Sequence, residues 1–144
     1  MLVGHVGLNV KEIDRSTRFY KDIFGYDVIG QSNENGKHFA FLGKEGQPKL
    51  TLWQQSNAEY NKEISGLHHL AFQADSVEQV ERIQQNLKEL GVKFIYDGIV
   101  PHAEGARSGG IFFEDPDGIR LEVYAATGAE KYDSPSEYPS CGFF

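Results

Sequence analysis

The sequence predicts an α+β fold built from two similar βαβββ modules, and three observations support this prediction. Residues 5–10 (HVGLNV) and residues 69–74 (HLAFQA) are two versions of one strand-like phrase that begins with a histidine. Each phrase precedes an amphipathic segment that ends at a glycine, Gly25 in one case and Gly91 in the other. The repeat has a period of roughly 60 residues, and such a period indicates structural units that complete one another.

The first module is expected over residues 1–56. Residues 3–10 alternate between apolar and other side chains, which is the period-2 pattern of a strand with unlike faces. A helix should follow, capped by Asp14 or Ser16 and ended by Gly25. Three short strands complete the module, at about 26–31, 37–43 and 49–55, with turns at 33–36 and 46–48.

The second module is expected over residues 66–126, after a polar linker at 56–66. It should begin with a strand at 67–74 and a helix capped by Asp75 or Ser76. The helix carries apolar residues at helical spacing: Val77, Val80, Ile83, Leu87 and Leu90. Strands are then expected at 93–99, 109–114 and 119–125, with a turn at 115–118 (DPDG). For the tail, 127–144, no regular element is predicted, although its aromatic end (Tyr138, Phe143, Phe144) suggests docking.

The composition limits the classes of protein to which the chain can belong. Hydrophobic residues make up 40% of 144 residues, which is ample for a core, and the apolar runs are too short to cross a bilayer. A net charge of -7 without a basic stripe argues against a nucleic-acid partner. The single cysteine, Cys141, excludes an intrachain disulfide framework. We also find no signal-peptide pattern, so we expect a cytoplasmic protein without a membrane or nucleic-acid partner.

Strand alternation predicts which polar side chains converge. If the apolar residues of each strand pack beneath the helices, His5, His69 and Glu122 share the opposite face, whereas His68 points to the helix side or starts the strand. Thr51 occupies the first-module position that corresponds to Glu122. Two imidazoles and one carboxylate on one face resemble a facial triad, which leaves coordination positions open. The alternative is that these are ordinary solvated or hydrogen-bonded side chains.

Several other residues are candidates for a site. Arg107 either pairs with an anionic substrate group or is a simple loop arginine. His102 and Tyr124 are candidates for proton transfer, or else pocket-wall or solvated side chains. Four aromatic residues either line an apolar cavity or make ordinary sheet packing: Trp53, Phe39, Phe41 and Phe112. Cys141 has no histidine near it in the sequence and is not proposed as a nucleophile.

Four phrases closely resemble the vicinal oxygen chelate superfamily, which includes glyoxalase I, bleomycin and fosfomycin resistance proteins and extradiol dioxygenases. They are residues 5–10, residues 18–26 (RFYKDIFGY), residues 69–72 and residues 113–122 (FEDPDGIRLE). The resemblance covers about residues 2–126, and the DPDG turn that leads to Leu121-Glu122 is its most specific element. It implies that the paired βαβββ modules form one domain, a cupped mixed sheet around a central metal site.

The resemblance also implies a function. His5, His69 and Glu122 would be the metal ligands, whereas Thr51 stands where glyoxalase I supplies a glutamate, so the pattern is nearer to the three-ligand members. We expect one divalent metal ion per site (Fe, Mn, Zn or Ni), a small substrate that chelates it through vicinal oxygens, and a homodimer. The reaction would be that of a metal-dependent lyase, isomerase or transferase, or of an extradiol-type dioxygenase. The alternative is a metal-free, small-molecule binding protein like the bleomycin resistance proteins.

Overall fold

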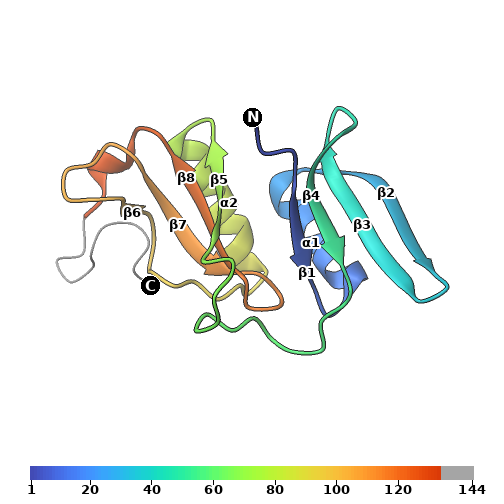
Figure 1. The fold of residues 1–144 in the computed structure, drawn as a ribbon. Helices are drawn as coiled ribbons and strands as arrows, with labels where there is room; N and C mark the ends of the chain where they lie inside the picture. Colours follow the sequence, from blue (N-terminus) through green and yellow to red (C-terminus); the bar gives the residue numbers. More distant parts are fainter. Residues whose placement is uncertain (134–144) are drawn as a thin grey trace. The chain divides into compact units, whose positions relative to one another are not determined.

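The computed structural model describes residues 1–133 and divides the chain into two compact units. The first unit is Met1–Tyr60, and the second begins at Asn61. Each unit contains one four-stranded mixed sheet and one long helix in the order βαβββ (Figure 1). The predicted α+β fold with two βαβββ modules is therefore confirmed.

The first module runs through β1 (Val6–Asn9), α1 (Ile13–Phe24), β2 (Asp27–Glu34), β3 (Lys37–Lys44) and β4 (Gln47–Trp53). Its strands lie in the order β1-β4-β3-β2, and only the β1–β4 pair is parallel. The helix packs on β3 and β4 (Figure 1). The side chains of Tyr20, Leu42 and Leu52 are fully buried and form the centre of this core.

The second module repeats this topology. It runs through β5 (Leu70–Ala74), α2 (Val77–Glu89), β6 (Val100–Pro101), β7 (Gly109–Glu114) and β8 (Arg120–Ala125), and a 3₁₀ turn, η1 (Ala129–Lys131), follows. The strand order is β5-β8-β7-β6, again with one parallel pair, β5–β8. Val80, Leu87 and Leu121 are fully buried where α2 packs on the sheet.

The helix ends are satisfied in different ways. Ser76 caps α2, as predicted, and its hydroxyl accepts a hydrogen bond from the Gln79 N–H. The predicted cap of α1 at Asp14 or Ser16 is wrong, because the helix already begins at Ile13. There the Gln54 side chain accepts a hydrogen bond from the Ile13 N–H at 2.8 Å. This N–H has no partner within the helix, and Gln54 takes the place of a capping side chain from the residues next to the helix start.

Two strand predictions extended too far, and one fell in the wrong place. The predicted strands 3–10 and 67–74 are observed as the shorter β1 and β5, so His5 and His69 immediately precede their strands instead of lying in them. Residues 93–99 do not form a strand and contribute an isolated bridge from Phe94 to Phe113. The paired strand here is β6, which starts only after Gly98, a residue with a φ of 88° that interrupts extended backbone.

The turns also differ in detail from the predictions. The β2–β3 turn contains only Asn35 and Gly36, both at positive φ, within the predicted 33–36. The β3–β4 turn falls at Glu45-Gly46, so that Gln47 and Pro48 belong to β4 instead of to the turn. In the tail, η1 is a regular turn that we did not predict. The expectations for Tyr138, Cys141 and the terminal phenylalanines lie outside the described residues.

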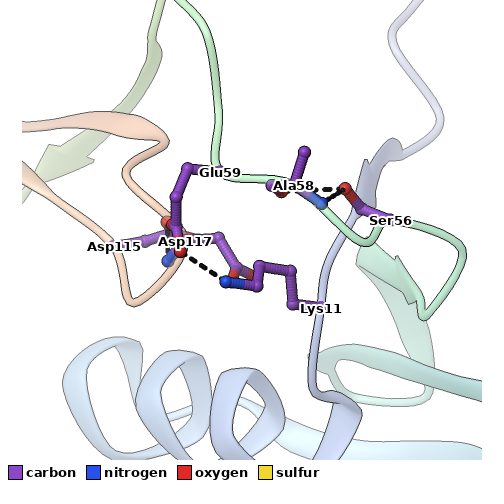
Figure 2. A network of polar contacts seen from close by, with 6 residues as sticks. All are labelled: Lys11, Ser56, Ala58, Glu59, Asp115 and Asp117. Atoms are coloured by element: carbon purple, nitrogen blue, oxygen red, sulfur yellow. Dashed lines mark hydrogen bonds and ion pairs between the residues drawn. The ribbon is translucent and has the colours of Figure 1, made fainter.

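The segment after β4 is held by local polar contacts (Figure 2). The Ser56 hydroxyl donates to the Ala58 carbonyl at 2.9 Å and accepts from the Ala58 N–H at 3.3 Å. Lys11 donates a hydrogen bond to Glu59. Because Glu59 is exposed, this ion pair orients the segment more than it stabilises the fold. Among residues 1–133, no helix is long and apolar enough to span a membrane.

Candidate metal centre

Glu122 is the centre of the polar cluster in the second unit. It lies in the middle of β8, opposite Ala71 of β5, while Leu121 and Val123 point to the other side of the sheet and are buried. Glu122 itself is only 2% exposed. A buried carboxylate is costly unless hydrogen bonds or a cation compensate its charge, so the groups around Glu122 are informative.

Two imidazoles flank the two oxygens of this carboxylate. His102 Nε2 lies 2.6 Å from Glu122 Oε1, and His69 Nε2 lies 3.4 Å from Glu122 Oε2. An ionised carboxylate can only accept, so His102 Nε2 carries the proton and donates it in this contact. The other ring nitrogen of His102, Nδ1, lies 3.0 Å from the Ser108 hydroxyl. His102 is thus held at both nitrogens, and its contact with Glu122 is shorter than that of His69.

His69 is also held from its other side. Its Nδ1 lies 2.8 Å from Nδ1 of His68, so one of these two atoms donates and the other accepts. Desolvation, together with the charges of His69 and Arg120, lowers the pKa of His68, which favours a neutral ring at neutral pH. With Nδ1 engaged in this way, Nε2 is the nitrogen of His69 that faces the carboxylate.

Tyr124 lies beside this cluster. Its half-buried ring packs against the His102 ring at a centroid distance of 5.4 Å. Its hydroxyl donates to Gln73 Oε1 at 3.2 Å, across the β5–β8 pair. The structure therefore brings together four of the candidates from the sequence: His69, His102, Glu122 and Tyr124. We did not identify Ser108, His68 or Gln73 as their partners, because the contact of Ser108 with His102 depends on loop geometry that no periodic pattern encodes.

The remaining candidates of the second unit lie apart from these contacts. The side chain of Arg107 is 72% exposed, and its Nε lies 3.8 Å from Glu130 Oε1. Phe112 lies directly opposite Glu122 in the β7–β8 register but is only 2% exposed, with the Tyr96 ring packed edge-on against it at 5.3 Å. Phe112 therefore forms a buried wall next to the carboxylate.

The first unit presents a different set of groups at the corresponding positions. His5 is exposed and lies two residues before Gly7, as His69 lies two residues before Ala71. Gly7 pairs with Thr51 in the register where Ala71 pairs with Glu122, so the predicted correspondence of Thr51 and Glu122 holds within the two sheets. Thr51 Oγ1 accepts a hydrogen bond from Trp53 Nε1 at 3.1 Å and is buried.

The donor chemistry of these groups suits a first-row divalent metal ion. Imidazole and carboxylate are ligands that Zn, Fe, Ni and Mn accept, and a buried carboxylate gains most from a nearby cation. Within residues 1–133, however, no group of three or more His, Cys, Asp or Glu side chains is already gathered in a metal-binding arrangement. The donors that lie together belong to the second unit, and His5 belongs to the first.

Comparison with known proteins shows where this chain belongs. Its sequence is 30% identical over 139 residues to the metallothiol transferase FosB of Staphylococcus epidermidis, an alignment that covers 96% of this chain and 89% of that protein. It is 26% identical over 133 residues to the catechol-2,3-dioxygenase of Bacillus subtilis, covering 85% of this chain but only 41% of that longer protein.

Solved structures show the same relationship. A putative glyoxalase from Bacillus halodurans superposes with a TM-score of 0.69 at 30% identity, covering 86% of this chain and 95% of that one. A variant of the fosfomycin resistance protein FosX from Listeria monocytogenes, in complex with Mn(II) and 1S,2S-dihydroxypropylphosphonic acid, superposes with a TM-score of 0.65 at 25% identity, covering 90% of this chain and 94% of that one. The family model for the glyoxalase/bleomycin resistance protein/dioxygenase superfamily matches residues 2–123, and the chain belongs to this superfamily.

Proposed function

We propose that this protein is a divalent-metal-dependent enzyme whose small substrate binds the metal through two neighbouring oxygens. The proposed ligands are His5, His69 and Glu122. The observation that carries the proposal is the buried Glu122 carboxylate, which is flanked by imidazole nitrogens at 2.6 and 3.4 Å. A relative that binds Mn(II) together with a vicinal diol supports the same chemistry.

The surrounding residues have separate roles in this proposal. A bound metal ion would act as a Lewis acid that stabilises negative charge on a substrate oxygen. His102 holds Glu122 through Oε1, which leaves Oε2 on the side of His69. With Ser108 at its Nδ1 and Tyr124 against its ring, His102 is fixed in place and is our candidate for holding and moving a proton.

We propose four substrate-contacting residues: Arg107 and Trp53, which are exposed, and Phe112 and Thr51, which are buried. Arg107 is exposed and brings a positive charge on the loop before β7. Phe112 forms an apolar wall beside Glu122, and Trp53 presents a partly exposed indole in the first unit. Thr51 is proposed as a substrate-side residue and not as a ligand, because a neutral alcohol is a weaker metal donor than a carboxylate.

Metal analysis tests the proposal most simply. Protein purified without added metal should carry about one divalent ion per chain, and Glu122→Gln should weaken Mn(II) or Zn(II) binding by at least about 100-fold. Glu114→Gln is the matched control, because Glu114 lies at the end of the neighbouring strand and pairs with Lys93 instead. Equal metal binding by all three proteins would exclude Glu122 as a ligand, whereas no metal binding by the wild type would favour the alternative, a metal-free binding protein.

Activity assays follow from the same proposal. The relatives suggest two reactions to try first: oxygen-dependent cleavage of catechol with Fe(II), and transfer of a thiol to fosfomycin with Mn(II) or Zn(II). Whichever reaction is found, loss of turnover in Glu122→Gln with normal turnover in Glu114→Gln is the expected result. Turnover that survives in Glu122→Gln would exclude this carboxylate from the active site.

We also propose that the protein is a homodimer in the cytoplasm. Among the described residues, β1 and β2 end the first sheet and β5 and β6 end the second, and the edges of a sheet favour pairing. Refolding a mixture of His5→Ala and Glu122→Ala chains tests whether a site is shared between chains. Metal binding that recovers in the mixture indicates a shared site, whereas none, despite proven heterodimers, indicates that each site is built within one chain.

A further inference from the structure

Three aromatic rings lie together on the first sheet, on the face that carries Gly7 and Thr51. The register pairs Phe39 with Trp53 and Phe41 with Thr51, so these side chains point to the same side. Phe39 and Phe41 stack at a centroid distance of 5.0 Å, and the Trp53 ring lies 5.5 Å from Phe39 and 5.8 Å from Phe41. We call Phe39, Phe41 and Trp53 the aromatic shelf.

The orientation of Trp53 is fixed by its neighbours. Its indole N–H donates to the Thr51 hydroxyl at 3.1 Å, and Thr51 is only 5% exposed. Gly7 leaves the necessary room, because a Cβ atom there would lie 3.3 Å from Thr51 Oγ1 and 3.8 Å from Trp53 Nε1. Trp53 nevertheless remains 38% exposed. Its ring is therefore held in place while part of its surface stays open to a ligand.

A cavity of about 370 Å³ adjoins this shelf, and Phe39 and Trp53 form part of its wall. This volume is near the lower limit for ligand pockets, which run from about 300 to 1,000 Å³, so it suits a single ring better than a larger molecule. The other lining residues bring polar groups: Gly36, Lys37, His38, Gln54 and Gln55. Lys37 adds a positive charge at the start of β3, in a chain whose net charge is -7.

We propose that this cavity binds a small planar aromatic anion, with its ring against Trp53 and its anionic group toward Lys37. Aromatic rings favour offset or edge-on contact with another ring, and the shelf offers rings in both orientations. A lysine ammonium at the cavity adds charge attraction for an anion. Every residue of this site belongs to the first unit, and none is a proposed metal ligand. Trp53 is also one of the proposed substrate-contacting residues, so the inference names a ligand class for that part of the proposed function, and its test uses metal-free protein to keep the two apart.

Trp53 is the only tryptophan in the chain, so its fluorescence reports on this cavity directly. We would titrate metal-free protein, kept in a chelator, with benzoate, cyclohexanecarboxylate and benzamide, exciting at the red edge of the indole band to avoid tyrosine. Benzoate should quench the emission saturably. Cyclohexanecarboxylate has the same charge without a planar ring, and benzamide has the ring without the charge, so each should bind about 3- to 10-fold more weakly.

Three variants test whether benzoate binds in this cavity. Thr51→Val removes the acceptor that orients the indole and should weaken benzoate binding by about 3-fold. Lys37→Met should remove most of the preference for benzoate over benzamide. Lys44→Met, at the exposed far end of β3, is the matched control and should bind like the wild type.

Three results would overturn the inference. The first is the absence of saturable quenching by benzoate, and the second is equal affinity for benzoate and cyclohexanecarboxylate. The third is an unchanged preference for benzoate over benzamide in Lys37→Met, a variant that should fold normally because Lys37 is exposed. If the wild-type protein binds metal normally but does not bind benzoate, only this inference fails and the proposed metal chemistry stands.

Discussion

The two modules share one topology but differ at the positions where their strands face the same side of the sheet. In register, Thr51 and Trp53 of the first module correspond to Glu122 and Tyr124 of the second. Thr51 and Trp53 are hydrogen-bonded to each other, and the indole of Trp53 is partly exposed, whereas the buried carboxylate of Glu122 lies between two imidazoles. The same βαβββ topology therefore carries an aromatic surface in the first module and a cluster of imidazole and carboxylate side chains in the second.

The lengths of the strands add to this contrast. The strand after α1 is the eight-residue β2, but its counterpart after α2 is the two-residue β6. Irregular segments lie on both sides of β6. In the segment after it, His102 contacts the Glu122 carboxylate and Ser108 contacts His102. The second module thus has a loop where the first has the longer strand β2, and this loop places candidate side chains at the sheet, as is common where a rigid scaffold positions loops.

The largest expected effect is on stability and concerns a glycine of each module. A Cβ atom on Gly110 would lie 2.1 Å from the Val123 carbonyl oxygen, which is sheet backbone and cannot move away, so Gly110→Ala should cost about 3 kcal/mol. A Cβ atom on Gly7 would meet only side-chain atoms, the nearest being Thr51 Oγ1 at 3.3 Å, so Gly7→Ala should cost less than about 1 kcal/mol. Urea unfolding measures both free energies, and similar costs would contradict the packing difference.

The next effect concerns one histidine from each module. His69→Ala removes a proposed metal ligand and should weaken metal binding by at least about 100-fold, beyond the 10- to 100-fold loss typical of outer-sphere changes. His38 in the first module contacts Asn33 instead, so His38→Ala should change the metal affinity less than about 2-fold. Calorimetry with Zn(II) makes the comparison, and equal metal uptake by wild type and His69→Ala would show that the proposed ligand set is wrong.

His102 tests whether the loop after β6 supports the carboxylate. His102→Phe keeps a flat ring next to Tyr124 but removes the hydrogen bond to Glu122 Oε1, so metal affinity should fall by about 10-fold. Ser108→Ala removes only the outer contact and should lower the affinity less. If calorimetry gives the same metal affinity for His102→Phe and the wild type, β8 alone positions Glu122.

The smallest expected effect concerns the two helix N-termini. Ser76→Ala removes a side-chain cap from α2 and should lower the free energy of unfolding by about 1 kcal/mol. Glu12, at the corresponding position of α1, makes no side-chain cap hydrogen bond, so Glu12→Ala should cost clearly less. Thermal unfolding of the two variants measures the difference. A larger loss of unfolding free energy in Glu12→Ala than in Ser76→Ala would show that the side-chain cap of α2 is not the stronger of the two.

The sequence predicted the modules because their signals are local. Alternation, the glycine that ends α1 in a left-handed conformation and the cap at Ser76 are each encoded within a few residues. The start of α1 was missed because Gln54, distant in the sequence, satisfies the Ile13 N–H. The irregular backbone at 93–99 was missed because apolar residues there pack without strand pairing, apart from the bridge at Phe94.

The strand positions of the candidate site were predictable from the sequence, but the contacts among its side chains were not. Repeat register identified Glu122 and its counterpart Thr51, because parallel pairing of the first and last strand is the same in both modules. The contacts of His102 with Glu122 and of His68 with His69 depend on loop paths and ring orientations, for which one sequence carries no periodic signal. Tertiary geometry therefore decides which histidine has which role.

X-ray absorption spectroscopy of the Zn(II)-loaded protein counts the imidazoles bound to the metal and therefore tests the proposed ligand set. We expect two imidazoles, from His5 and His69, with Glu122 supplying oxygen. His5→Ala should leave one imidazole at the metal, whereas His102→Phe should leave both. Loss of an imidazole in His102→Phe, with none lost in His5→Ala, would rule out the proposed ligand set and show that the second module binds the metal by itself.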